Sequence, residues 1–385
     1  MKQPSPDIVA AKWRFEIAMR REPTGPIIAR EAVRESDFGD VTSELWMYAL
    51  LRKHRPDVPL ERVRPRITPH YAAKRSGKLD GYRLEVDSRG ETHSLEFSIS
   101  SLSPVAIRAS RRLVDQGLVG EGDRLHWELS ADCHEDEPSR ADRAGNVIVR
   151  EIPRPLEHIA VPIRLLQEHA RTIGTTDERD YPVYYLAGAL LDAARLSREG
   201  SKHQPPIETG AALLGQLCSC PETGEFFAVV LAAEPLEAAE ETRFSLSFSA
   251  RTWQRIQSRL EQMRARPEGR AARLLGEAHG HPFAPQELAG QRESQQAWGE
   301  ADHTAWASDA DITWARAVFA KAPFQLNHIF GKTATGRDVH ALYGLRNGTL
   351  GERGFAIIPR FEPEWIEGPK HVKSRCGDGD EEKDR

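Results

Sequence analysis

The chain has 385 residues, which is enough for two or three domains that each bury a core of their own. It carries 53 basic and 58 acidic residues, and the net charge of −5 lacks the basic excess of nucleic-acid-binding and membrane-surface proteins. Four irregularly spaced cysteines exclude a disulfide framework, and no apolar run suits a signal peptide or a spanning helix. We therefore expect a cytoplasmic protein of mixed α/β class that binds neither nucleic acid nor membranes.

Residues 1–150 predict an N-terminal α+β domain with no recognisable chemistry, which we interpret as a recognition or docking domain. Apolar residues in a polar background indicate a first helix around Ile8, Trp13, Ile17 and Met19. The later patterns indicate, in order, a helix at Glu44–Leu51, strands at Tyr82–Val86 and Ser94–Ile99, a helix at Pro104–Gln116, and strands at Arg124–Leu129 and Val147–Val149. The polar stretch 132–146 is the best candidate for the domain boundary.

Residues 151–365 predict a second domain, a mixed sheet flanked by helices, and the charged residues 366–385 predict a disordered tail. The expected helices are a short one around Ile163 and longer ones at Tyr184–Arg198, Thr252–Arg266 and Ala307–Phe319. The expected strands are Ile207–Leu217, Glu225–Ala233, Phe244–Phe248, a strand through His279 and His281, Gln325–Phe330, Val339–Tyr343 and Gly354–Ile358. Cys218 and Cys220 would share one strand face, and we interpret them as small buried side chains rather than a metal or redox pair.

The pair His279 and His281 is the strongest chemical signal in the sequence. Residues two apart on a strand point the same way, so both imidazoles would reach one point, with Gly280 on the opposite face. Two imidazoles that meet in this way are a common start of a transition-metal site. The alternative is that they are ordinary polar residues at a strand end.

Three further residues would complete a hydrolytic zinc site. A third ligand is needed, and Asp311 is a candidate because it lies in the first turn of a predicted helix. A base that does not bind the metal is also needed. Glu208 is a candidate because it lies at the start of an apolar strand, where partial burial raises a carboxyl pKa toward neutrality. Ser308, three residues before Asp311, could donate to the oxyanion.

Taken together, Glu208-x-Gly210, His279-x-His281-Pro282 and Ser308-x-x-Asp311 resemble the signature of the JAMM (JAB/MPN) zinc metalloproteases, in particular their prokaryotic members. The resemblance covers roughly residues 180–360. It implies a domain with cytidine deaminase-like layering and one Zn²⁺ per chain, bound by His279, His281 and Asp311. It further implies Glu208 as general acid/base and Ser308 as oxyanion donor. The implied activity is that of a deubiquitinase-like isopeptidase that cleaves after the C-terminus of a ubiquitin-like or sulfur-carrier protein. The implied partners are that protein or its conjugates, with conjugating or activating enzymes as further partners.

The spacing departs from the family pattern at one place. Ser308 follows His281 by 27 residues, whereas most family members have the two motifs much closer together. We interpret residues 283–305 as an insertion of the kind with which family members grip ubiquitin-like substrates. Glu300, Asp302 and His303 lie in this segment and are alternative third ligands.

Two other functions remain open. The first is a non-catalytic MPN-type scaffold that only binds partner proteins, although such relatives usually lose motif residues and all five positions are filled here. The second is an amidohydrolase barrel, which also uses His-x-His but places it near the first strand. Only 104 residues follow His281, too few for the rest of such a barrel.

Overall fold

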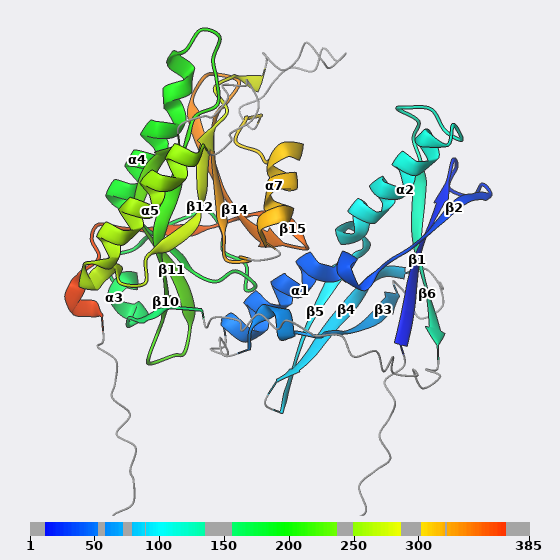
Figure 1. Cartoon of the computed structure of the whole chain (residues 1–385), viewed down its shortest axis with the longest axis horizontal. Coiled ribbons are helices and arrows are strands. Elements are labelled where there is room, and N and C mark those ends of the chain that lie inside the picture. Colours follow the sequence, from blue (N-terminus) through cyan, green and yellow to red (C-terminus); the bar gives the residue numbers. More distant parts are fainter. Residues whose placement is uncertain are drawn as a thin grey trace, which may run out of the picture.

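The computed structural model describes residues 12–52, 58–71, 79–88, 90–134, 156–236, 249–285, 302–319 and 322–366 (Figure 1). The fold is mixed α and β, as expected, with two three-stranded sheets in the N-terminal half and a larger sheet in the C-terminal half. The predicted strands at Val147–Val149 and Phe244–Phe248, most of the boundary loop and nearly all of the tail lie outside the described residues. No helix in the described ranges is long and apolar enough to cross a membrane.

The N-terminal half consists of two antiparallel sheets packed around one core with two helices. One sheet has the order β2-β1-β6 and the other the order β3-β4-β5. The elements are β1 (Lys12–Arg20), β2 (Ile27–Ala32), α1 (Gly39–Leu45, continued by a π-helical turn at Trp46–Leu51), β3 (Arg66–Tyr71), β4 (Leu79–Ser88), β5 (Glu91–Ser98), α2 (Ser103–Asp115) and β6 (His126–His134). The rings of Phe15, Phe38 and Tyr82 pack edge to face in the core, with centroids 5.2–6.2 Å apart.

The helix predicted around Trp13, Ile17 and Met19 is wrong, because these residues form β1, which pairs with β2 and β6. Phe15 completes an alternation of apolar residues at every second position, and this two-residue period is that of a strand. The helix at Glu44–Leu51, the strands in β4, β5 and β6, and the helix in α2 are confirmed.

The C-terminal half is built on a sheet that has ten strands among the described residues. Nine of them follow the order β15-β14-β13-β12-β10-β11-β9-β16-β8, and β7 pairs with β10. The strands are β7 (Ile159–Ala160), β8 (Arg171–Ile173), β9 (Val183–Leu186), β10 (Gly210–Ser219), β11 (Phe226–Leu236), β12 (Arg273–Gly280), β13 (Leu326–Lys332), β14 (Asp338–Arg346), β15 (Thr349–Arg353) and β16 (Phe355–Ile358). The helices are α3 (Ile163–Gln167), α4 (Ala187–Arg198), α5 (Ala250–Arg264) and α7 (Asp309–Phe319).

One predicted boundary in this half needs correction. The helix expected from Tyr184 begins at Ala187, because Tyr184 and Tyr185 belong to β9 and lie buried between β11 and β16. Aromatic residues fit the pleated surface of a buried strand well. The expected strands that correspond to β10, β11, β12, β13, β14 and β16 are confirmed, whereas β7, β8, β9 and β15 were not predicted.

Helices α4 and α5 cover opposite faces of the sheet at β10. Ala189 and Ala193 of α4 belong to the same core cluster as Leu213, whereas Ile256 of α5 packs with Leu214, the next residue along β10. Because successive strand residues face opposite ways, this alternation places the two helices on different faces. Cys218 and Cys220 are free thiols buried in a third apolar cluster, as their interpretation as core side chains expects.

Candidate metal centre

Strand β12 carries the histidine pair into the middle of the sheet, between β10 and β13. His279 is the last residue but one of the strand, and His281 is the first residue after it. The backbone N–H of His281 donates to the carbonyl of Phe330 at 2.8 Å. Their rings are 5.1 Å apart between centroids, and both side chains are buried. Gly280 faces α4, where a Cβ would lie 1.9 Å from the carbonyl oxygen of Ser197. The residue between the histidines therefore has to be glycine for helix and strand to pack this closely.

The sheet register brings Glu208 to the same place. Gly210 of β10 pairs with His279 in antiparallel register, and the backbone N–H of Gly280 donates to the carbonyl of Thr209 at 3.0 Å. Continuing this register by two residues sets Glu208 opposite His281. The Oε1 atom of Glu208 lies 3.7 Å from Nε2 of His281.

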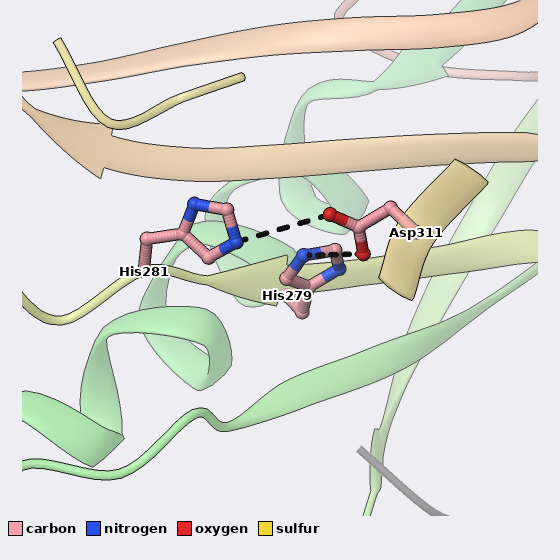
Figure 2. Close-up of side chains that lie close together, drawn as sticks. All are labelled: His279, His281 and Asp311. Atoms are coloured by element: carbon pink, nitrogen blue, oxygen red, sulfur yellow. Dashed lines mark ion pairs between the residues drawn. The ribbon is translucent and has the colours of Figure 1, made fainter. Parts of the chain in front are cut away.

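Asp311 reaches the histidines from α7 and is held by Ser308. The Ser308 backbone N–H and hydroxyl both donate to Oδ2 of Asp311 at 2.7 Å, and the Asp311 N–H donates back to the Ser308 hydroxyl at 3.2 Å. This is a reciprocal helix cap, which fixes the carboxylate at the helix start. Oδ1 of Asp311 lies 3.2 Å from Nε2 of His279, and Oδ2 lies 4.0 Å from Nε2 of His281 (Figure 2).

The chain returns to the site through Thr304. Its hydroxyl donates to the carbonyl of Phe283 at 3.1 Å, so the two ends of the segment between the histidines and Ser308 are bonded to each other. Its own carbonyl accepts from Nδ1 of His281 at 2.6 Å. The rings of Phe283 and Trp306 contact the His281 ring, stacked and edge-on respectively. The 27-residue spacing therefore does not prevent Asp311 from reaching the pair.

The three side chains fit a divalent metal ion. His279, His281 and Asp311 each offer one ligand atom, and these atoms lie within 4.8 Å of one another. Nε2 of His279 is buried, and its 3.2 Å contact with Oδ1 of Asp311 does not have the geometry of a hydrogen bond, so a cation between the two atoms would compensate both. Burial lowers the pKa of His279 to about 4 and also lowers the pKa of His281, which favours the neutral imidazoles that metals bind.

Glu208 remains outside this ligand group and has the properties of a proton acceptor. Burial raises its pKa to about 7, and the nearby Asp311 carboxylate adds to the rise. A pKa near neutrality suits a group that takes up and releases a proton in one reaction cycle.

The alternative third ligands are not part of the site as described. His303 forms an isolated β-bridge with Thr333, and neither it nor Asp302 belongs to the described group of ligand atoms. Glu300 lies outside the described residues.

Besides the rings of Phe283 and Trp306, sequence reasoning missed two polar groups beside the histidines, Thr304 and Glu277. Oε1 of Glu277 lies 3.8 Å from Nδ1 of His279. Glu277 could have been found, because the two-residue period that relates His279 to His281 extends back to it. Thr304 contacts His281 through its backbone carbonyl, which leaves no signal in the sequence.

No protein-family model matches the chain, and no curated protein matches it. Among solved structures, the chain is similar to the solution structure of protein DSY2949 from Desulfitobacterium hafniense, with 14% sequence identity and a TM-score of 0.31. The similarity covers 48% of this chain and 99% of that one. This likeness is too slight to indicate a function.

Proposed function

We propose that the chain is a zinc-dependent peptidase of the JAMM type, which cleaves a peptide or isopeptide bond after the C-terminus of a ubiquitin-like or sulfur-carrier protein. The observation that carries this proposal is the convergence of His279, His281 and Asp311 beside the separate carboxylate of Glu208. Three protein ligands leave a fourth position open, which distinguishes a catalytic zinc site from a structural one. The ubiquitin-like substrate comes from the family resemblance alone.

Each side chain has a role in this reaction. His279, His281 and Asp311 would hold the metal, which when bound supplies Lewis-acid activation of water and of a carbonyl group. Glu208 would take the proton from the attacking water and deliver it to the leaving amine. Oδ2 of Asp311 would stay oriented by the backbone N–H of Ser308.

The oxyanion role of Ser308 requires a change from the arrangement described here. A serine hydroxyl has one proton, and that of Ser308 is donated to Asp311. To donate to the oxyanion, the hydroxyl would rotate away from Asp311, which would keep the backbone N–H as its donor.

Metal content and cleavage test this function together. Protein purified without added metal is expected to carry about one zinc ion per chain and to cleave a ubiquitin-like fusion. We expect Glu208→Gln to keep the zinc and to lose about 10²- to 10⁴-fold in cleavage rate, because glutamine cannot accept the proton. His279→Ala should lose both zinc and cleavage.

The scaffold alternative gives the opposite results. Zinc clearly below one equivalent in the wild-type protein, together with unimpaired binding of partner proteins, would favour a non-catalytic MPN-type scaffold. If Glu208→Gln cleaved the fusion as fast as the wild type, the proton-transfer role of Glu208 would be wrong.

A further inference from the structure

Glu277 is a buried carboxyl group beside the metal ligands that the proposed reaction does not use. It lies two residues before His279 on β12, so its side chain shares the sheet face of the histidines. Only 5% of its surface is exposed. A buried carboxyl group is costly unless polar groups compensate it, so its surroundings indicate what it does.

Two polar groups approach Glu277 among the described residues. Nδ1 of His279 lies 3.8 Å from its Oε1 atom. The side-chain amide of Asn327 donates to the same oxygen at 3.5 Å, from the position on β13 that pairs with Glu277. Asn327 is itself fully buried, so the amide and the carboxyl form a small polar layer beneath His279.

The two nitrogens of His279 therefore face different partners. Nε2 points toward Asp311 at 3.2 Å, and Nδ1 points toward Glu277. A neutral imidazole that binds a metal through Nε2 must carry its proton on Nδ1, and the acceptor of that proton selects this tautomer. For His281 the acceptor is the carbonyl of Thr304.

We propose that Glu277 is the corresponding acceptor for His279 and positions its ring for the metal. This inference rests on the metal-binding part of the proposed function. The separation of 3.8 Å is longer than a hydrogen bond, and we expect metal binding, which fixes the ring, to close it. Asn327 would orient the carboxyl group from the next strand.

Zinc affinity, measured by chelator competition on the full chain, separates this role from a general packing role. Glu277→Leu removes the acceptor, and we expect zinc affinity to fall about 10- to 100-fold. Glu277→Gln keeps a carbonyl oxygen that can accept from Nδ1, so it should stay within a few-fold of the wild type. The comparison also tests whether Glu277 is a fourth ligand. Both variants would remove a ligand carboxylate, so both would then lose zinc affinity.

Gln216→Leu is the matched control. Gln216 is fully buried on β10 and donates to the carbonyl of Glu268 at 2.7 Å, so its loss also removes a buried hydrogen bond from the sheet. It lies six residues along β10 from the partner of His279, roughly 20 Å at 3.3 Å per residue. Its replacement should leave zinc affinity unchanged.

The tautomer can also be read in the wild-type protein, which keeps the test decisive if Glu277→Leu does not fold. In ¹H–¹⁵N spectra of the zinc-loaded protein, we expect His279 to be bound through Nε2 and to carry a proton on Nδ1 that exchanges slowly with solvent. Binding through Nδ1 would overturn the positioning role. Equal zinc affinities of Glu277→Leu and the wild type, or an equal loss in Gln216→Leu, would overturn it as well.

These readouts do not depend on peptide cleavage. A wild-type protein that binds zinc but cleaves nothing would overturn the peptidase and leave the role of Glu277 standing. A wild-type protein that binds no zinc would overturn both.

Discussion

At the scale of single residues, Ser308 and Asp311 show how one sequence motif serves both the helix and the site. The Ser308 hydroxyl caps α7 by accepting from the backbone N–H of Asp311, and the Asp311 carboxylate accepts from the backbone N–H of Ser308. The same carboxylate presents its other oxygen to His279. Helix capping and ligand orientation are therefore coupled, and a change that breaks the cap should also weaken the metal site.

We expect Ser308→Ala to have both effects. Loss of the cap should destabilise the protein by about 1 kcal/mol, and loss of the hydroxyl contact to Asp311 should weaken zinc binding about 10-fold. Urea unfolding and chelator competition measure the two effects. Ser249→Ala is the control, because Ser249 caps α5 in the same way, accepting from Thr252 at 3.0 Å, and contacts none of the three ligands.

The two variants should lose similar stability, and only Ser308→Ala should weaken zinc binding. If Ser249→Ala weakened zinc binding as much as Ser308→Ala, the effect would follow from lost helix stability. If Ser308→Ala kept wild-type zinc affinity but cleaved more slowly, the hydroxyl would serve the oxyanion alone.

At the scale of elements, the close contact between β12 and α4 determines which residue can separate the histidines. Gly280 lies against the last turn of α4, and Ser197 there leaves no room for a side chain. The opposite face of the same strand carries Glu277 and His279. The packing of α4 on one face thus fixes the ligands on the other.

Gly280→Ala tests this contact. The added Cβ would lie 1.9 Å from the carbonyl oxygen of Ser197, so α4 and β12 must separate, at a cost of about 1–3 kcal/mol. Gly188→Ala is the matched control, because Gly188 lies in the same helix with open space around it, and alanine there should be neutral or stabilising by up to about 1 kcal/mol. Thermal unfolding of the two variants measures the difference. Equal thermal unfolding midpoints of the two variants would show that α4 can move away from β12 without loss of stability.

Elements with a clear period were predictable from the sequence, and those set by tertiary pairing were not. The alternation in β4 and β5 and the helical spacing of α5 indicated their types directly. Short strands such as β7 and β8 have too few residues to show a period, and they exist because β10 and β16 offer them an edge. In β1, Phe15 reveals the alternation only when it is counted with its apolar neighbours.

The candidate site was predicted through its chemistry rather than its fold. Glu208, His279, His281, Ser308 and Asp311 were named from residue type and order, and the structure brings them together. The contacts that orient them were not predicted. The carbonyl of Thr304 is a backbone group that leaves no signal in the sequence, and the pairing of Glu277 with Asn327 depends on which strand lies beside β12.

At the scale of the whole molecule, the turn between β14 and β15 contacts the N-terminal half of the chain (Figure 1). Gly348 in this turn donates its N–H to Oε2 of Glu44 in α1 at 2.9 Å, and Asn347 donates to Ser100 at 3.1 Å. Helix α1 also contacts α7, which carries Asp311. The N-terminal half thus packs against an element of the candidate site.

Glu44 makes this junction sensitive to pH. It is only 3% exposed, and its Oε1 atom has no hydrogen-bonding partner among the described residues. Burial raises its pKa to about 7 from an ordinary value of 4.5, against the opposing effects of the Gly348 N–H and the nearby Arg179 and Arg346. The folded protein therefore holds a proton here that the unfolded chain releases between pH 4.5 and about 7.

The sign of the effect follows from this proton. The protonated Glu44 contributes to the free energy of unfolding in full below pH 4.5, the ordinary pKa of the group. This contribution is lost as the pH rises through about 7, because the folded state must then ionise a buried carboxyl group. Glu44→Gln cannot ionise and can still accept the N–H of Gly348. We expect it to unfold like the wild type at pH 5 and to be more stable at pH 8, by up to about 3 kcal/mol at 1.36 kcal/mol per pKa unit.

Urea unfolding of both proteins at the two pH values measures this difference. The exposed Glu121, changed to glutamine, is the control, and its effect should be small and the same at both pH values. A stabilisation by Glu44→Gln at pH 5 equal to that at pH 8 would mean that glutamine packs better than the neutral acid. A loss of stability at pH 8 would mean that the ionised carboxylate, attracted by Arg179 and Arg346, holds the two halves together.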